Sequence, residues 1–163
     1  MISKYFSLQN RGSLRSGYFE STISSLRERE TRGWWNEFRF QLNVNNNTNL
    51  DISLLNGFDK GKQQGKEFVA RARGITVNGK LLFSRTGRFQ TEITIVNVEE
   101  EKESIYLPPE VLKSYPVGSS IRTNTQFQYL FNRSLSLIFN FGTINDQRYN
   151  NFVSFQGEMR AHF

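Results

Sequence analysis

The sequence predicts an all-β fold: an antiparallel up-and-down transmembrane β-barrel of about eight strands, or the C-terminal eight-strand part of a larger barrel. Apolar and polar residues alternate along most of the chain, as they do in strands with two different faces. The expected connections alternate between short and long, which is typical of barrels that span an outer membrane. The chain also closes on an aromatic residue, Phe163, at the end of such an alternating strand.

Composition fits this class. The 163 residues are expected to form one domain, 1–163. The chain holds 15 Phe, 6 Tyr and 2 Trp, yet its mean hydropathy is only −0.55. In a transmembrane barrel only every second strand residue faces lipid, so a high aromatic content and a low average hydropathy occur together. No run of about 18 apolar residues is present, so we expect no transmembrane helix.

The same composition excludes several function classes. The chain has no cysteine, which excludes disulfide scaffolds, thiol catalysis and cysteine-ligated metals. It has a single histidine, His162, so we expect no catalytic, cofactor-binding or metal site and no enzyme activity. The net charge is +6, but the basic residues are spread along the chain and form no recognised motif, so we expect no nucleic-acid binding.

The first elements are the least distinct. Residues 1–16 are predicted to be an N-terminal lead-in, followed by a weak strand over 17–26. Residues 1–10 contain no apolar stretch and no cleavage site of small residues, so they are not a signal peptide. We therefore expect either a processed form or the C-terminal part of a longer protein, and favour the second.

The middle of the chain holds the clearest alternation. Trp34–Asn46 predicts a strand, and a short turn then leads to a second strand over Leu50–Leu54. We expect a long connection over Phe58–Lys66 before the next strand begins at Phe68. Asn78–Gly79 predicts a hairpin turn, because this pair suits the backbone of two-residue hairpin loops. One long strand over Leu81–Val98 is predicted to follow.

The C-terminal third repeats the pattern. Residues 99–118 are predicted to form a long external loop. Strands are expected over Ile121–Tyr129 and Leu135–Phe141, joined by a tight connection at 131–133. The last strand is predicted over 151–163, where residues of one parity are small or apolar and those of the other are polar.

Four segments near the C-terminus carry a family resemblance. They are Leu107-Pro108-Pro109-Glu110, a strand led by Gly118, Tyr129–Leu137 and Gly157–Phe163. Together they resemble the C-terminal end of large outer-membrane β-barrel proteins of Bacteroidetes-like bacteria. The resemblance implies a location in the bacterial outer membrane, with outer-membrane lipid and the barrel-assembly machinery as partners and other envelope proteins as further candidates. It implies that the last strand is the assembly signal, carried by Phe155, Gly157, Met159, Ala161 and Phe163.

Polar strand positions are predicted to face the barrel interior. An eight-stranded barrel is just filled by its interior side chains, so we favour a paired structural network that is closed to flow. In a wider barrel the same residues would line a water-filled lumen biased toward anions. The predicted lumen-facing residues are Glu37, Arg39, Arg71, Arg73, Arg88, Glu92, Arg122, Glu158 and Arg160.

Aromatic residues and one loop segment have further predicted roles. Trp34 and Trp35 near one end, and Tyr129 and Phe131 near the other, are predicted interfacial anchors, because such rings are enriched where membrane meets water. For the two tryptophans, gripping a ligand is the alternative. The apolar segment 105–117 is predicted to fold over something, as a lid or as a contact for a partner.

These observations predict a porin-like outer-membrane protein with a structural or transport role and no catalysis. Two alternatives remain open. A soluble lipocalin-like barrel would turn its apolar face inward and bind a small apolar ligand. A soluble β-sandwich would serve as an interaction module, with shorter strands and long cross-connections.

Overall fold

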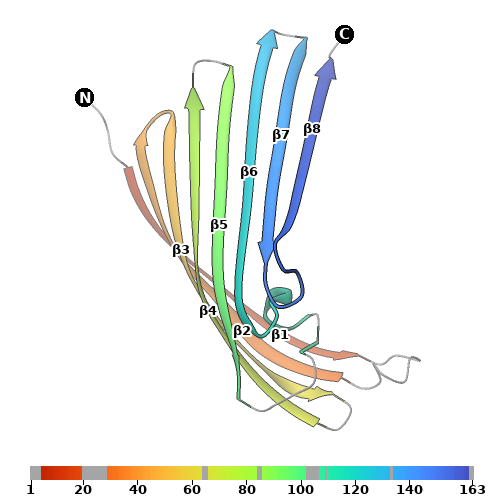
Figure 1. Cartoon of the computed structure of the whole chain (residues 1–163). Coiled ribbons are helices and arrows are strands. Elements are labelled where there is room, and N and C mark those ends of the chain that lie inside the picture. The colour runs from red at the N-terminus through yellow and green to blue at the C-terminus, as the bar shows by residue number, and fades with distance from the viewer. Residues whose placement is uncertain are drawn as a thin grey trace.

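A computed structural model describes residues 5–19, 29–63, 66–83, 86–101, 107–108, 110–132 and 134–161. Eight strands form one sheet, in which each strand pairs antiparallel with its neighbours in sequence (Figure 1). One short 3-10 helix, η2 (Val111–Ser114), lies between β5 and β6. The strands are β1 (Tyr5–Phe19), β2 (Arg29–Asn45), β3 (Thr48–Gln63), β4 (Lys66–Phe83), β5 (Gly87–Glu100), β6 (Gly118–Asn132), β7 (Leu135–Asn145) and β8 (Phe152–Ala161).

The predicted antiparallel up-and-down order of eight strands is confirmed, but the sheet is open. Among the residues that the structure describes, β1 and β8 stand at its two edges and are not paired with each other. The sheet is strongly curved, and η2 lies on the inside of the curve (Figure 1). In the described part of the chain, no helix is long and apolar enough to cross a membrane.

Three short connections lie together at one end of the sheet (Figure 1). They join Asn45 to Thr48, Phe83 to Gly87 and Asn132 to Leu135. The hairpin predicted at Asn78–Gly79 is wrong, because these residues lie inside β4 and pair with both β3 and β5. The chain turns after Phe83 instead, whose ring stacks on Phe127 with 5.7 Å between centroids. The single strand predicted over Leu81–Val98 is therefore two strands.

Two predictions about the opposite end are also wrong. No long connection lies over Phe58–Lys66, because β3 and β4 continue pairing as far as Gln63 and Lys66. The lead-in predicted over 1–16 is mostly β1, which pairs with β2 from Tyr5 to Phe19. The weak strand predicted over 17–26 falls largely outside the described residues.

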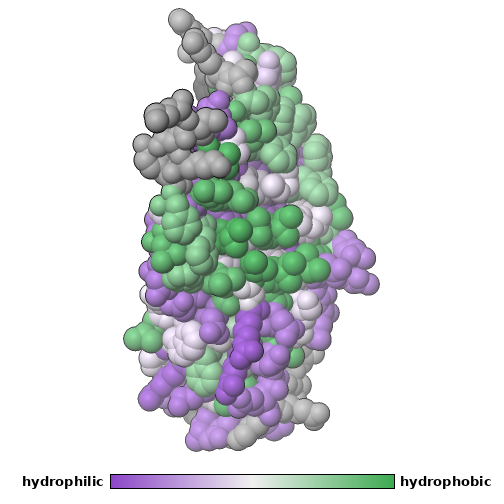
Figure 2. Space-filling view, turned by 90° about the vertical axis from the view of Figure 1, so that its left-hand side faces the viewer, coloured by the Kyte–Doolittle hydropathy of each residue, from purple (hydrophilic) through white to green (hydrophobic). Residues whose placement is uncertain are grey.

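The pairing register divides the sheet into two faces. One face, here called the band face, carries an apolar residue from each of five neighbouring strands in a single row: Phe38, Leu54, Ile75, Ile95 and Ile121. The next row toward the η2 end, here called the boundary row, is polar in the same five strands: Asn36, Asn56, Arg73, Asn97 and Ser119. Figure 2 shows the resulting division of one side of the molecule into a hydrophobic band and a hydrophilic region.

The other face, here called the network face, carries mainly polar and charged residues and also the principal apolar core. That core lies at the η2 end, where strand residues such as Trp35, Phe68 and Val96 pack against Val111 and Leu112. Ala70 and Ala72 are fully buried there. The core thus joins the sheet to the connection between β5 and β6, and positions that connection on the inside of the curve.

Candidate functional site: a polar network and a docked segment

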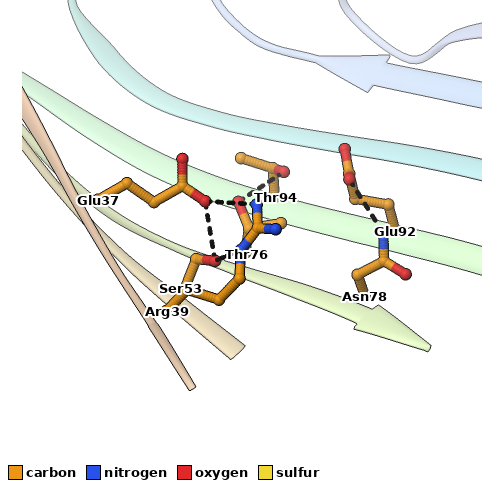
Figure 3. Close-up of polar contacts among 7 residues, drawn as sticks. All are labelled: Glu37, Arg39, Ser53, Thr76, Asn78, Glu92 and Thr94. Carbon is orange, nitrogen blue, oxygen red and sulfur yellow. Dashed lines mark hydrogen bonds and ion pairs between the residues drawn. The ribbon is translucent and has the colours of Figure 1, made fainter. Parts of the chain in front are cut away.

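Three hydrogen-bonded groups of side chains lie on four neighbouring strands of the network face (Figure 3). Arg39 Nη2 donates to Glu37 Oε1 over 2.8 Å, and Ser53 Oγ donates to the same oxygen over 3.1 Å. The hydroxyls of Thr76 and Thr94 lie 3.0 Å apart. Further along, Asn78 Nδ2 donates to Glu92 Oε2 over 3.3 Å. The face therefore offers hydrogen-bonding groups in rows, with charges largely balanced by neighbours on the same or the adjacent strand.

Most of the predicted lumen-facing residues share the network face. The register places seven of them on it: Glu37, Arg39, Arg88, Glu92, Arg122, Glu158 and Arg160. Glu158 and Arg160 pair with each other on β8, with 2.6 Å from Arg160 Nε to Glu158 Oε1.

Arg71 and Arg73 were placed wrongly by the sequence pattern, because both lie on the band face. Arg73 belongs to the boundary row, and Arg71 lies one row beyond it, 6.0 Å from the ring centre of Phe58. In this part of β4 the small and apolar residues are the even-numbered Phe68, Ala70 and Ala72, which are buried on the network face. Along this stretch of β4, where a segment of chain covers the network face, the alternation is therefore inverted.

The segment that covers it is residues 110–117, here called the docked segment. The carboxylate of Asp59 anchors it: Leu112 N donates to Oδ2 over 2.7 Å, and Arg15 Nη2 donates to Oδ1 over 2.7 Å. Asp59 is only 4% exposed. Leu112, Lys113 and Ser114 have φ angles of 46°, 54° and 65°. Non-glycine residues persist in this left-handed region only where the surrounding structure holds them, so docking fixes the shape of the segment.

Trp35 forms the floor of the docked segment. Its ring stacks on Tyr115 with 6.2 Å between centroids, and the Lys113 ammonium lies 4.7 Å from its ring centre. A Cβ at Gly57 would come within 2.5 Å of the indole, so glycine is required for the ring to lie flat on β3. Trp35 is 7% exposed, and its predicted role as an interfacial anchor is wrong because it points to the network face.

The remaining predicted anchors lie on the band face. Trp34 is 39% exposed and lies one row beyond the boundary row. Tyr129 and Phe131 pack edge to face, 5.1 Å between centroids, at the end with the short turns. These three rings thus lie near the two ends of the apolar band. Whether they meet a membrane surface stays a prediction.

A second anchor holds the other end of the docked segment. The side chain of Asp146 is fully buried and accepts hydrogen bonds from the backbone N–H groups of Arg148 and Tyr149. Arg148 Nη2 donates to the carbonyl oxygen of Ser114 over 2.6 Å. The Arg122 guanidinium lies 4.3 Å from the ring centre of Tyr115. Burial raises the pKa of the Tyr115 phenol, which keeps this ring neutral.

Sequence reasoning predicted that the segment over 105–117 would fold over something, but it missed both anchors. Asp59 lay in a stretch expected to be a loop, and Asp146 lay in a connection, where carboxylates are ordinarily solvated. The one signal available for Asp59 was that Gly57 and Gly61 lie on either side of it, since glycines inside a strand mark a close approach of other atoms. Of the predicted assembly signal, Phe155, Gly157, Met159 and Ala161 lie on the band face of β8; Phe163 lies outside the described residues.

Comparisons with protein-family models, with curated proteins and with solved structures found no match. No relative therefore supplies a function. The two faces of the sheet and the docked segment are the features from which the function is inferred.

Proposed function

We propose that this chain forms a section of the wall of a bacterial outer-membrane β-barrel, with a structural or transport role and no catalysis. The observation that carries the proposal is the band face, whose large apolar side chains are extensively exposed. Phe155 and Met159 are each 69% exposed, Phe6 is 65% and Val153 is 58%. Apolar surfaces of this extent mark a membrane or a protein interface, because leaving them in water is unfavourable.

The dimensions of the band suit a bilayer. On β4 its apolar residues run from Ile75 to Phe83, which is roughly 27 Å at about 3.4 Å per residue. Transmembrane barrels carry an apolar belt about 25 Å tall. The boundary row is polar on all five strands. One row beyond it, β2 and β3 carry the rings of Trp34 and Phe58, whereas β4 and β5 carry the charged residues Arg71 and Glu99. Charged residues follow on β2 and β3 at Arg32 and Lys60, so these strands are longer than a membrane alone requires.

The open edges set a further condition on the proposal. Backbone N–H and C=O groups cannot remain unpaired in hydrocarbon, so spanning sheets must close. In the proposed barrel, the free edges of β1 and β8 therefore pair with additional strands. A closed barrel wider than eight strands has room on its inside for the docked segment as well as for water.

The lipocalin-like alternative finds less support. It requires an apolar interior that holds a ligand, whereas the inside of the curve carries the ion pairs of Glu37 with Arg39 and of Asp59 with Arg15. Apolar residues of that face such as Trp35, Phe68 and Val96 are already packed against the docked segment.

Arginine substitutions on the band face test the proposal. Ile93→Arg and Phe139→Arg each place a charge among residues proposed to face lipid, at a cost of about 2–4 kcal/mol near the bilayer midplane. Both variants should fail to enter the outer membrane and should lose heat-modifiable migration on gels. The matched control is Asn124→Arg, on the network face of β6, which should integrate normally. Normal integration of both band-face variants would overturn the proposal.

A further inference from the structure

We propose that the docked segment and the cations around it form an anion-selective constriction on the inner wall of the barrel, an inference that rests on the proposed function. Lys113 of the segment and three cations around it contribute: Arg15, Arg122 and Arg148. Each is tied to it by a contact described above, to Asp59, to the ring of Trp35 or Tyr115, or to the carbonyl of Ser114.

The arrangement of charge around the segment is asymmetric. Side-chain exposure is 35% for Arg15 but 6% for its partner Asp59. It is 31% for Arg122 and 46% for Arg148, but 0% for Asp146, which lies between them at 3.7 and 3.8 Å. Lys113 is exposed. The carboxylates are thus buried in the wall, while the guanidinium and ammonium groups cover them and face the interior of the curve.

The sum of the charges near the docked segment is also positive. Glu92 is an exposed carboxylate of the same face, and Glu37 is neutralised by Arg39. Arg29 pairs with Glu110 of the segment, and Glu100 lies on the same face of β5. With these groups included, five cations balance five carboxylates, and Arg11, exposed on the same face, leaves one positive charge in excess. The cations lie in front of the buried carboxylates. A passing ion therefore comes closer to positive charge than to negative charge, and the potential inside the curve is more positive than the sum alone indicates.

The segment is also built to stay in place. Asp59 and Arg148 hold it from two sides, and its left-handed residues follow from those contacts. A fixed projection narrows a water-filled passage and keeps its charges in a defined position. Channels select anions with arginine and lysine side chains at such constrictions, and low-dielectric walls strengthen the effect. The solutes expected are small anions such as chloride or carboxylate-bearing molecules.

Ion selectivity tests the inference. The closed barrel that contains this chain is purified and inserted into planar bilayers with a KCl gradient, and the sign of the reversal potential reports whether Cl⁻ or K⁺ passes more readily. We expect preference for Cl⁻, and a several-fold fall in the ratio of Cl⁻ to K⁺ permeability in Lys113→Glu. Arg148→Gln is a second variant that removes charge without adding any. The control is Lys60→Glu, which makes the same charge change on the band side of β3, beyond the boundary row, and should leave the ratio unchanged.

The outcomes separate the two proposals. Three results with membrane-inserted protein overturn the constriction and leave the proposed function standing. They are conduction without a preference for Cl⁻, no conduction at all, and a selectivity that neither variant changes. Protein that never enters the bilayer or the outer membrane overturns the proposed function, and the constriction with it. A shift produced equally by Lys60→Glu would also overturn the constriction, because the effect would then come from the overall charge.

Discussion

At the scale of single residues, Asp59 links the sheet to the docked segment. It is a buried carboxylate with two donors, one from the Leu112 backbone and one from Arg15. Buried charges are tolerated where they are paired and hydrogen-bonded, and docking of the segment supplies the second of the two donors of this carboxylate. The left-handed backbone of Leu112, Lys113 and Ser114 is therefore held in part by a side chain that lies more than fifty positions earlier.

The first prediction follows from this dependence. Asp59→Ala leaves the Leu112 N–H without its acceptor, at a cost of about 1–3 kcal/mol for an unsatisfied buried group, and the segment should detach from the sheet. Limited digestion of the inserted protein with trypsin should then cut after Lys113 much faster than in the unchanged protein. Asp51→Ala, on the same face of β3 but far from the segment, is the control and should not alter this cleavage. Equal resistance of Asp59→Ala would show that the segment is held without the carboxylate.

At the scale of elements, the strands could be predicted from alternation, but their ends could not. Asn78–Gly79 has the composition of a hairpin turn, yet both neighbours pair with β4 across it. Tertiary pairing overrides the local preference, since each additional pair adds backbone hydrogen bonds and side-chain contacts such as those of Phe83. A turn signal is only a local property, whereas the position of a hairpin depends on the register of the whole sheet.

The backbone of Gly79 gives the second prediction. Gly118 has φ +90°, whereas Gly79 is not among the positive-φ glycines, and a Cβ added to it meets nothing nearer than 3.8 Å. Gly79→Ala should therefore leave stability unchanged or raise it by about 0.4–1 kcal/mol, because it restricts the unfolded chain. Gly118→Ala should destabilise by about 1 kcal/mol or more. Urea unfolding in lipid micelles measures both; a clear loss of stability in Gly79→Ala would restore the hairpin at this site.

The candidate site, like the strands, could be predicted from the sequence only in part. Seven of the nine predicted lumen-facing residues share one face because parity is fixed along a regular strand. Arg71, Arg73 and Trp35 were assigned to the wrong face because small and aromatic residues here are buried by a segment distant in sequence. Parity separates polar from apolar, but it does not say which apolar residues face outward. That requires knowing which face the connection between β5 and β6 covers.

At the scale of the whole molecule, the boundary row emerges only when the strands are aligned. Asn36, Asn56, Arg73 and Asn97 occupy unremarkable positions along the chain, separated by stretches of different length. The register brings them side by side, next to a row that is apolar in every one of these strands. A straight step from apolar to polar across neighbouring strands is the pattern expected where a sheet leaves the hydrocarbon of a bilayer.

The last prediction locates this step directly. The chain has no cysteine, so single cysteines can be introduced at Ile95 and Asn97 on β5, and at Leu54 and Asn56 on β3. In isolated outer-membrane fragments a water-soluble maleimide should label Asn97→Cys and Asn56→Cys but not Ile95→Cys or Leu54→Cys. In the protein without lipid, Ile95 is 43% exposed and Leu54 is 49%, so protection at these positions requires a covering layer. Denatured samples, in which all four should react, control for the chemistry of the thiols. Equal labelling of both members of each pair in the fragments would mean that the band face meets water, and the membrane assignment would then fail.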